Sequence, residues 1–382
     1  MNSFYSFTIY NSTAELPPYW DNLAVSTVFL SKSYLEVLEQ SSPVNMLCNY
    51  IGIFDNEILV GIAVSQFLNL NKLESFGDRD KCIKTAIRNI VFRNFASHVL
   101  IIGNNMLTGQ NAYAFANSID KNKVTQALYD ATNQLKKIFK SKGIPIHITT
   151  YKDFSSEEIK HFETPAFKKY YQFSTQPNMV FSIHESWKSE QDYIDSLSKK
   201  YRDQYKRSRK KASGIEKRKL NLEEIIRLED TINDLYFHVA KNAPFNTFFL
   251  PKNHFRIFKE IFKEKFLFYG YFIGEKLIGF NTLIKNGEVM DTYFLGYDDS
   301  IQRENMLYLN MLYDMIAYSI KKDFKEIVFA RTALEIKSSV GAKPITMYGL
   351  ISHTNPLVNP YMSIIFKYLE PKTIWQQRNP FK

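Results

Sequence analysis

The sequence predicts an α/β protein with mixed, α+β-like sheets, built as two tandem domains of one fold, and three observations support this. Two motifs recur in the same order: TVFLSK at 27–32 returns as TFFLPK at 247–252, and GIFDNEILVG at 52–61 returns as GYFIGEKLIG at 270–279. Each copy has the pattern of a helix followed by two strands and a tight turn. The 382 residues are also enough for two domains that each bury a core. Chance similarity between two ordinary hairpins is the alternative.

The first domain is predicted to span residues 1–176. Its expected helices repeat apolar residues at a spacing near 3.6, and its expected strands are short apolar or alternating runs. The run HVLIIG at 98–103 is continuously apolar, which is typical of a buried strand. The predicted elements are helix 32–40, strands 45–54 and 58–67, helix 81–92, strand 98–103, helix 121–139 and strand 144–150.

The second domain is predicted to span residues 177–382 and repeats this alternation. The turn Asn286-Gly287 is a strong signal for a β-hairpin. Antiparallel hairpins that lead into a helix–strand crossover predict a mixed sheet. The predicted elements are helices 221–241, 252–263 and 305–321, with strands 266–273, 276–284, 289–296 and 326–330.

A basic helical segment leads into the second domain. The net charge of the chain is +10, and residues 199–219 hold eleven Lys and Arg against two acidic residues, which leaves +9 in this segment. One helix is predicted over 189–213, because Ser189 to Asp192 forms a capping box and Gly214 is a suitable stop. Like charges one turn apart repel, and a polyanion would relieve the repulsion. A phosphate-bearing ligand and a merely solvated face are the alternatives.

Candidate anion-binding residues lie on this helix and in the loop after the strand predicted at 326–330. Ligands gather at the carboxyl ends of strands in open α/β sheets. A glycine in that loop would allow close approach of the backbone to a ligand. A surface loop with solvated lysines is the alternative reading. The candidate phosphate-binding residues are Lys200, Arg202, Arg331, Lys337, Lys343 and Gly341.

Candidate catalytic residues lie on the strand predicted at 289–296. Asp291, Tyr293 and Tyr297 alternate along it or just beyond it, so they are expected to share one face. A carboxylate and phenols on such a face can orient or deprotonate an amine. Tyrosines on strands also commonly pack in a core, which is the alternative.

Several classes of site are not predicted. The sequence has no Gly-x-Ser-x-Gly elbow, Walker loop or His-Glu-x-x-His motif. Cys48 and Cys82 are isolated, so we expect neither a disulfide nor a metal site. No apolar run reaches the roughly 18 to 20 residues of a transmembrane helix, and the N-terminus lacks the pattern of a secretion signal. A cytoplasmic protein is expected.

Three stretches resemble the GNAT acyltransferase superfamily, arranged in tandem as in the Fem-type aminoacyl transferases of peptidoglycan bridge synthesis. They are the basic run at 197–211, the hairpin from 279 to 296, and the KSSVGAKP motif at 337–344. The resemblance implies an acyl or aminoacyl transferase that forms an amide on an amine acceptor. It also implies acyl-CoA or aminoacyl-tRNA as co-substrate, with no permanently bound cofactor. The phosphate-bearing partner would then be tRNA or a nucleotide-linked precursor.

One stretch departs from the superfamily. Acetyl-CoA enzymes have Gln/Arg-x-x-Gly-x-Gly/Ala before the central helix, whereas this chain has QRENML at 302–307. Leu307 is expected to crowd a phosphate, which leaves the donor open between aminoacyl-tRNA and an acyl thioester. The alternative function is a non-catalytic tandem GNAT-like protein that binds RNA. A third expectation is peripheral contact between the basic face and an anionic membrane.

Overall fold

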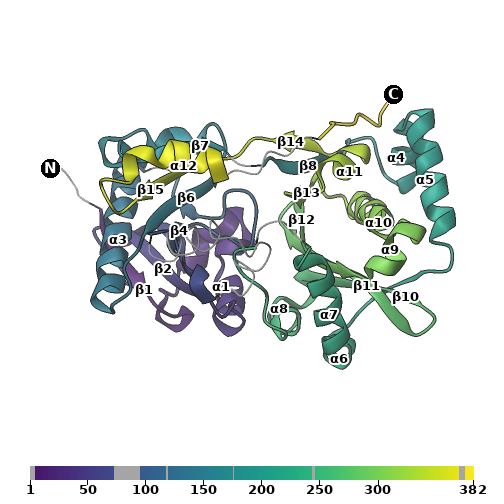
Figure 1. Cartoon of the computed structure of the whole chain (residues 1–382), viewed down its shortest axis with the longest axis horizontal. Coiled ribbons are helices and arrows are strands. Elements are labelled where there is room, and N and C mark those ends of the chain that lie inside the picture. The colour runs from purple at the N-terminus through teal and green to yellow at the C-terminus, as the bar shows by residue number, and fades with distance from the viewer. Residues whose placement is uncertain (1–4, 73–94, 118, 175, 243–245, 370–374) are drawn as a thin grey trace, which may run out of the picture. The chain divides into compact units, whose positions relative to one another are not determined.

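The chain forms two compact units, each built around one mixed sheet (Figure 1). The computed structural model describes residues 5–72, 95–117, 119–174, 176–242, 246–369 and 375–382. The helix predicted at 81–92 lies outside the described residues. The first unit comprises residues 1–175, 247–251 and 346–372, and the second comprises 176–246, 252–345 and 373–382.

This division differs from the predicted domains 1–176 and 177–382. The change of unit at 175/176 lies next to the predicted boundary, but 247–251 and 346–372 belong to the first unit. The physical reason is strand pairing: β15 (Tyr348–His353) lies between β6 (Ile148–Phe154) and β7 (Tyr171–Ser174). The C-terminal part of the chain therefore returns to complete the first sheet.

The described strands of the first sheet follow the order β1-β2-β3-β4-β6-β15-β7, with β5 also paired to β3. β4 and β6 run parallel, and their neighbours in this order are antiparallel. The remaining strands of this sheet are β1 (Ser6–Tyr10), β2 (Met46–Asp55), β3 (Ile58–Asn69), β4 (His98–Ile102) and β5 (Tyr113–Phe115).

Helices pack on both faces of the first sheet. The apolar stripe of α3, which includes Val124 and Leu128, joins the core that contains Ile51 of β2. On the opposite face the hydroxyl of Tyr50 donates to the carbonyl of Leu35 in α1. The helices of this unit are α1 (Lys32–Gln40), α3 (Lys121–Ser141) and α12 (Met362–Leu369).

The described strands of the second sheet follow the order β14-β8-β13-β12-β11-β10-β9, with β12 and β13 parallel. Its central strands are buried on both faces, as expected when helices cover both sides. The strands are β8 (Asn178–Ser182), β9 (Glu216–Lys219), β10 (Phe266–Ile273), β11 (Lys276–Asn286), β12 (Val289–Tyr297), β13 (Glu326–Ala330) and β14 (Lys343–Ile345).

Alternating residues of β10 face two different helix layers. Phe266 stacks on Phe258 of α8, with ring centroids 4.4 Å apart. Leu267 and Tyr269 join the core on the other face, which is formed with α10. The helices of this unit are α4 (Glu190–Ser196), α5 (Lys199–Lys211), α6 (Leu222–Arg227), α7 (Glu229–Ala240), α8 (His254–Phe262), α9 (Asp299–Asn305), α10 (Leu307–Lys321) and α11 (Leu334–Ser339).

The hairpin motif of the predicted internal repeat is present in both units, whereas residues 247–251 of the other motif belong to the first unit. Gly52 and Gly61 hold the same ladder positions in β2 and β3 as Gly270 and Gly279 hold in β10 and β11. Each hairpin also has a β-bulge between its glycine pairs and its turn. A Cβ at Gly52 or Gly270 would meet a phenylalanine ring and a leucine of the same hairpin at 2.7–3.2 Å. The two hairpins therefore share their packing as well as their glycine positions.

The basic segment is not one helix over 189–213, as predicted, but two. α4 ends before Leu197, and the amide of Ser198 donates to the carbonyl of Pro380 at 2.8 Å. Leu197 also forms a β-bridge with Phe381. Contacts with the C-terminal residues thus stabilise a break that the local sequence does not indicate. The helix predicted at 221–241 is likewise divided, at Leu228, into α6 and α7.

Candidate functional site

The second sheet opens between two parallel strands. The ladder between β12 and β13 spans Val289 to Asp291, whereas β12 continues to Tyr297 beside β11. At the point of separation the Thr292 hydroxyl donates to the Val328 carbonyl at 2.9 Å. Ligands of open α/β sheets bind beyond the carboxyl ends of parallel strands. The opening of β12 after Asp291 is therefore the candidate site.

A β-bulge lies directly at this opening. The ladder between β11 and β12 passes from Leu283↔Thr292 to Asn281↔Leu295, so β12 carries one extra residue at Tyr293 and Phe294. Bulges re-aim side chains and are over-represented beside active sites. In the second unit the bulge turns two successive aromatic side chains toward α7 and α8, since Tyr293 meets α8 and Phe294 meets α7.

The bulge also corrects one expectation. Asp291, Tyr293 and Tyr297 do not share one face of the sheet. Tyr293 contacts His254 of α8, whereas Tyr297 packs against Tyr308 of α10 with ring centroids 6.2 Å apart. The extra residue reverses the alternation of side chains beyond it. Of the three predicted catalytic residues, two lie on the α8 face and one lies on the α10 face.

Asp291 lies at the closed end of the opening. Its side chain is buried, and the Asn286 amide donates to its Oδ2 at 3.0 Å. Burial raises the pKa of Asp291 to about 7. A carboxyl group with this pKa can exchange a proton near neutral pH, which is the property that a general base needs.

Tyr293 is paired with a buried histidine that the sequence analysis missed. Its hydroxyl lies 3.0 Å from Nε2 of His254, the first residue of α8, and the His254 side chain is fully buried. A weak signal was present in the sequence. His254 precedes Phe258 by one helical turn and so lies on the apolar face of its helix, where a polar group needs a partner.

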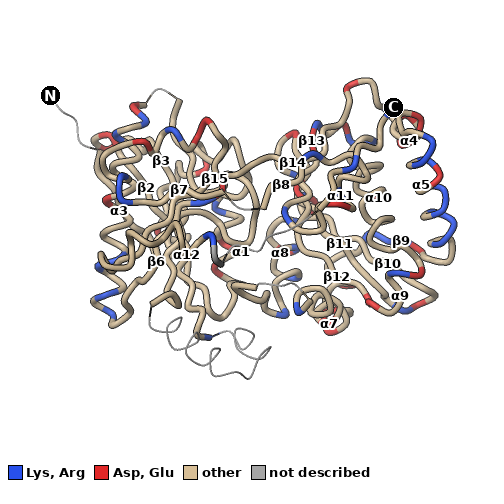
Figure 2. Tube along the Cα trace, turned by 45° about the horizontal axis from the view of Figure 1, so that its top comes forward, with Lys and Arg blue, Asp and Glu red and all other residues tan. Residues whose placement is uncertain are grey.

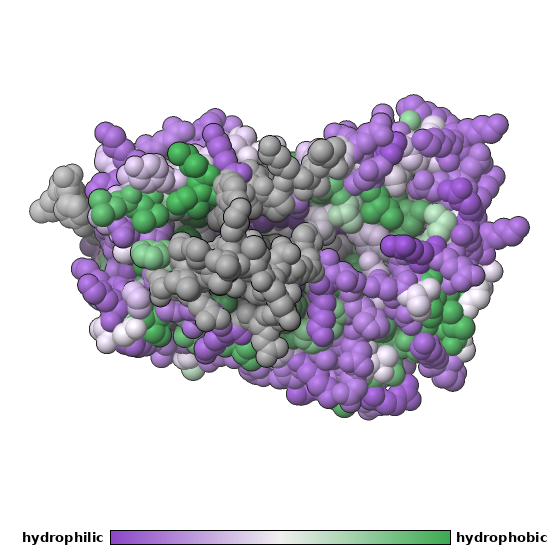
Figure 3. Space-filling view, in the orientation of Figure 1, coloured by the Kyte–Doolittle hydropathy of each residue, from purple (hydrophilic) through white to green (hydrophobic). Residues whose placement is uncertain are grey.

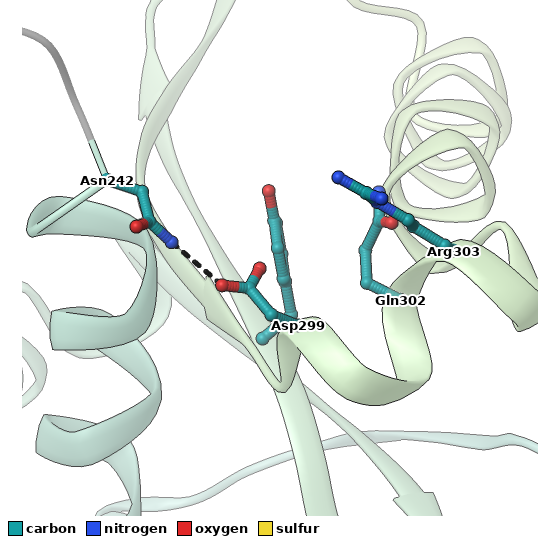
Figure 4. Close-up of a pocket in the computed structure, with 5 residues that line it drawn as sticks. Asn242, Asp299, Gln302 and Arg303 are labelled. Atoms are coloured by element: carbon teal, nitrogen blue, oxygen red, sulfur yellow. Dashed lines mark hydrogen bonds between the residues drawn. The ribbon is translucent and has the colours of Figure 1, made fainter.

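A cavity of about 570 Å³ lies at the carboxyl end of β12 (Figure 4). It is lined by Asn242, Tyr297, Asp299, Gln302 and Arg303. The Asn242 amide donates to Oδ2 of Asp299 at 2.7 Å, while the side chains of Gln302 and Arg303 approach from α9. A guanidinium and side-chain amides are groups that bind phosphate oxygens. The cavity therefore combines groups of this kind with the carboxylate of Asp299.

The expectation that Leu307 crowds this region is wrong. Its side chain is fully buried, and its Cδ2 lies 3.0 Å from where a Cβ of Gly279 would stand. Leu307 is therefore directed onto β11 as part of the core. Met306, between α9 and α10, has a φ of 49°, and this left-handed residue separates the two helices. The side chain of Leu307 gives no steric reason to exclude an acyl thioester.

The first unit differs at the equivalent point of its ladder. β3 pairs through Ser65 with Ile102 and through Ala63 with Tyr113, so the residues from 103 to 112 depart from the sheet there. Polar side chains hold this loop in place. For example, the Asn104 amide donates a hydrogen bond to the Tyr34 hydroxyl at 2.8 Å. The small bulge of the second unit is thus a long loop in the first.

The predicted phosphate-binding residues of α5 face solvent. Lys200 is exposed and Arg202 is half-buried. Lys and Arg follow the length of α5 in Figure 2, and the surface over this helix is hydrophilic in Figure 3. Arg209 differs, because it is bonded to Glu190 at 2.7 Å and to Asp314 at 2.6 Å. The exposed cations of α5 are Lys199, Lys200, Lys206, Arg207, Lys210 and Lys211.

Lys200 lies beside a second cavity, of about 450 Å³, between α5 and α11. The C-terminal Arg378 lines the same cavity and forms an ion pair with Glu335. Lys200 therefore lines the same cavity as Glu335 and Arg378. The cavity is lined by Lys200, Tyr201, Gln204, Glu335, Ile336, Ser339 and Arg378.

Lys337 is directed inward and does not present its charge to a ligand. The side chain is buried, and Nζ donates to the carbonyls of Phe329, Ala330 and Arg331 at 2.5, 3.3 and 2.7 Å. Burial lowers the pKa of Lys337 to about 7. The geometry contradicts the expectation of phosphate binding, because the three donors of the ammonium already have acceptors.

The other three predicted anion-binding residues have different surroundings from one another. Arg331 donates from Nε to the carbonyl of Gln176 at 3.1 Å, and Lys343 is exposed on β14. Gly341 has a φ of 110°, and a Cβ there would lie 2.5 Å from the ring of Phe381. The glycine is therefore needed for packing against the C-terminal residues.

Within the described part of the chain, no group of three or more His, Cys, Asp or Glu side chains could hold a metal ion. No helix among the described residues is long and apolar enough to cross a bilayer.

Comparisons with known proteins give structural neighbours. No protein-family model and no curated protein matches the sequence. A tandem GNAT protein from the clavulanic acid biosynthesis pathway matches with a TM-score of 0.53 and 7% identity, covering 92% of this chain and 99% of that one. FemX matches with a TM-score of 0.51 and 10% identity, covering 96% and 100%. A Bacteroides thetaiotaomicron protein of unknown function matches at 0.50 and 11%, covering 90% and 99%. The chain therefore has the tandem GNAT-like fold that FemX also has.

Proposed function

We propose that the chain is an acyl or aminoacyl transferase that forms an amide on an amine acceptor. The observation that carries this proposal is the separation of β12 from β13 after Asp291, together with the β-bulge at Tyr293 and Phe294. Strand openings of this kind expose backbone groups and side chains to a bound carbonyl without unfolding the sheet. The first unit has the loop 103–112 at the same ladder position, so we assign the reaction to the second unit.

The reaction joins the nitrogen of the acceptor to the carbonyl carbon of the donor. A C–N bond forms, and the C–S bond of a thioester or the C–O bond of an aminoacyl ester breaks. Backbone N–H groups of β12 beyond Asp291 would stabilise the developing oxyanion. Asp291 accepts the proton of the amine, through a water molecule because the carboxyl group is buried. The hydroxyl of Tyr293 supplies a proton to the leaving sulfur or oxygen.

The donor carries phosphates in either case, since acyl-CoA and aminoacyl-tRNA are both anionic. Tyr297, Gln302 and Arg303 line the cavity at the end of β12 and would contact the donor there. Lys200 and Arg202 on α5 would contact phosphates of a larger substrate, such as tRNA or a nucleotide-linked precursor. Arg331 and Lys343 remain proposed minor contacts. No permanently bound cofactor is proposed, and the proposed location is the cytoplasm.

A second candidate function rests on the exposed cations of α5. They favour binding of RNA without catalysis, and they would also permit peripheral contact with anionic lipid. Binding of RNA alone does not separate the two functions, because an enzyme that uses charged tRNA would bind it as well.

The decisive experiment is detection of the product. The protein is incubated with acyl-CoA thioesters or charged tRNA and a panel of amines, and new amides are sought by mass spectrometry. We expect an amide with the wild type and a decrease of about 100-fold or more in Asp291→Asn. Tyr318→Phe is the control, because Tyr318 packs on Tyr269 of β10 and has no role in the proposed reaction. Binding of tRNA without an amide from any donor would favour the RNA-binding function.

A further inference from the structure

His254 and Tyr293 form a polar pair inside an aromatic layer. Nε2 of His254 lies 3.0 Å from the Tyr293 hydroxyl, and the rings are nearly parallel, with an interplanar angle of 30°. The imidazole also lies beside Phe255 and Phe258, whose ring centroids lie 5.9 and 5.8 Å away. α8, which carries His254, lies beside β11 and β12 in Figure 1.

Core packing alone does not explain a histidine at this position. His254 is fully buried, and phenylalanines occupy the neighbouring inward positions of α8. A phenylalanine would fill similar space without burying a polar group, and a buried polar group that lacks a hydrogen bond is destabilising. The hydrogen bond to Tyr293 is an interaction that a phenylalanine at this position could not make.

We propose that His254 is a positioning residue for Tyr293, and that it stabilises the phenolate formed when Tyr293 protonates the leaving group. This inference rests on the proposed transferase function. Nε2–H donates to the phenolic oxygen, which leaves the hydroxyl proton of Tyr293 available to the reacting atoms. In this proposal the Nε2-protonated imidazole is the form that donates to the phenolic oxygen.

Every proton that moves in the proposed step is accounted for. The phenolic proton moves to the leaving sulfur or oxygen as the bond to the carbonyl carbon breaks. The proton released by the attacking amine passes to Asp291 and, through water, restores the hydroxyl of Tyr293. His254 keeps its own proton throughout. Its hydrogen bond becomes stronger when the phenolic oxygen is charged, because charge-assisted bonds are roughly twice as strong as neutral ones.

A test without substrate measures the acidity of Tyr293 directly. Tetranitromethane nitrates phenolates, and peptide mass spectrometry gives the nitration rate at each tyrosine of the full-length protein. We expect the rate at half-buried Tyr293 to fall about 10-fold in His254→Phe and to remain largely intact in His254→Gln, whose amide N–H can replace Nε2–H. Tyr361, which is 59% exposed, is the internal reference and should not change.

The opposite result overturns the inference. A rate at Tyr293 that is unchanged or higher in His254→Phe, with Tyr361 unchanged, means that His254 does not stabilise the phenolate. Circular dichroism establishes that each variant is folded. His254→Met, which also lacks an N–H donor, replaces the phenylalanine variant if the latter does not fold.

The transfer assay adds a kinetic readout. In the amide-forming assay with wild-type protein, His254→Phe should lower kcat about 10-fold or more with little change in KM, and should have no further effect in Tyr293→Phe. Additive losses in the double variant would show that His254 acts independently of Tyr293, contrary to the inference. If wild-type protein forms no amide, the proposed function fails, while the nitration experiment still decides whether the pair exists.

Discussion

Replacing Asp291 with asparagine should stabilise the second unit while it abolishes transfer. The carboxyl group is buried, and the pKa of Asp291 is raised from 3.8 to about 7 by burial. Because the folded pKa lies above the unfolded one, the folded state retains a proton that the unfolded chain releases between these values. The contribution of Asp291 to the free energy of unfolding is therefore most favourable below pH 3.8, and it falls as the pH rises toward 7.

The size of the effect follows from the two pKa values. A difference of about three pKa units corresponds to about 4 kcal/mol at pH 8, at 1.36 kcal/mol for each unit. Asparagine has nearly the same shape and carries no charge, so it removes this penalty. Its side-chain oxygen can still accept the hydrogen bond from Asn286 that Oδ2 accepts in the wild type. The stabilisation should shrink to near zero at pH 4.

Urea unfolding followed by tryptophan fluorescence measures this difference. Trp187 and Trp375 belong to the second unit and Trp20 to the first, so a Trp20→Phe background reports on the second unit alone. Asp323→Asn is the control, because Asp323 is largely exposed and its left-handed backbone suits asparagine. We expect this control to change little at either pH.

Three outcomes would contradict this prediction. If Asp291→Asn lowers the free energy of unfolding at pH 8, the carboxylate is stabilised by its surroundings and is not penalised by burial. If the difference from wild type is the same at pH 4 and pH 8, ionisation of Asp291 is not its cause. A stabilised variant that still transfers at the wild-type rate would remove Asp291 from the proposed mechanism.

Three further predictions concern the strand, the buried lysine and the basic helix. Gly296→Ala should destabilise the second unit by at least about 1–3 kcal/mol in urea unfolding, because the new Cβ would lie 2.5 Å from the backbone of α7. Gly214→Ala is the control, since nothing lies within 4 Å of a Cβ at that position. Lys337→Met should cost about 1–3 kcal/mol by leaving buried carbonyls without their donor, yet leave tRNA affinity unchanged in a filter-binding assay. The double variant Lys206→Glu, Lys210→Glu should weaken tRNA binding and make it less dependent on salt, and equal affinity at low salt would contradict this.

Local patterns were sufficient for much of the fold. The hairpins at 52–61 and 270–279 were predicted because alternation, glycine positions and turns are all encoded within a few residues. The strand at 326–330 was likewise predicted from a short apolar run that the structure shows as β13. These elements needed no knowledge of their distant neighbours.

Long-range pairing could not be predicted in the same way. β15 joins the first sheet beside β6, although about 200 residues separate them in sequence, as the pairing of Leu350 with Tyr151 shows. The break between α4 and α5 depends on the C-terminal Pro380 and Phe381. Such pairings leave no periodic signal in the residues that they join, so the domain ranges and the single basic helix were wrong.

In the candidate site, too, local patterns were predicted from the sequence, whereas features that depend on the folded chain were not. Tyr293 and the strand that carries it were identified from alternation, but one extra residue in β12 turned Tyr297 to the other face. The sequence predicts Lys337 as an anion-binding residue because it lies near Gly341 in a segment that follows a strand. Whether its ammonium faces inward depends on left-handed residues, among them Ala330, that only the folded loop reveals.

The most direct test of the account is to locate the bound donor. Hydrogen–deuterium exchange is measured with and without the donor that supports amide formation, in the absence of acceptor. The account predicts protection of peptides covering 292–303, at the opening of β12 and along α9. Protection confined to the loop 103–112 of the first unit, or no protection at 292–303, would contradict it.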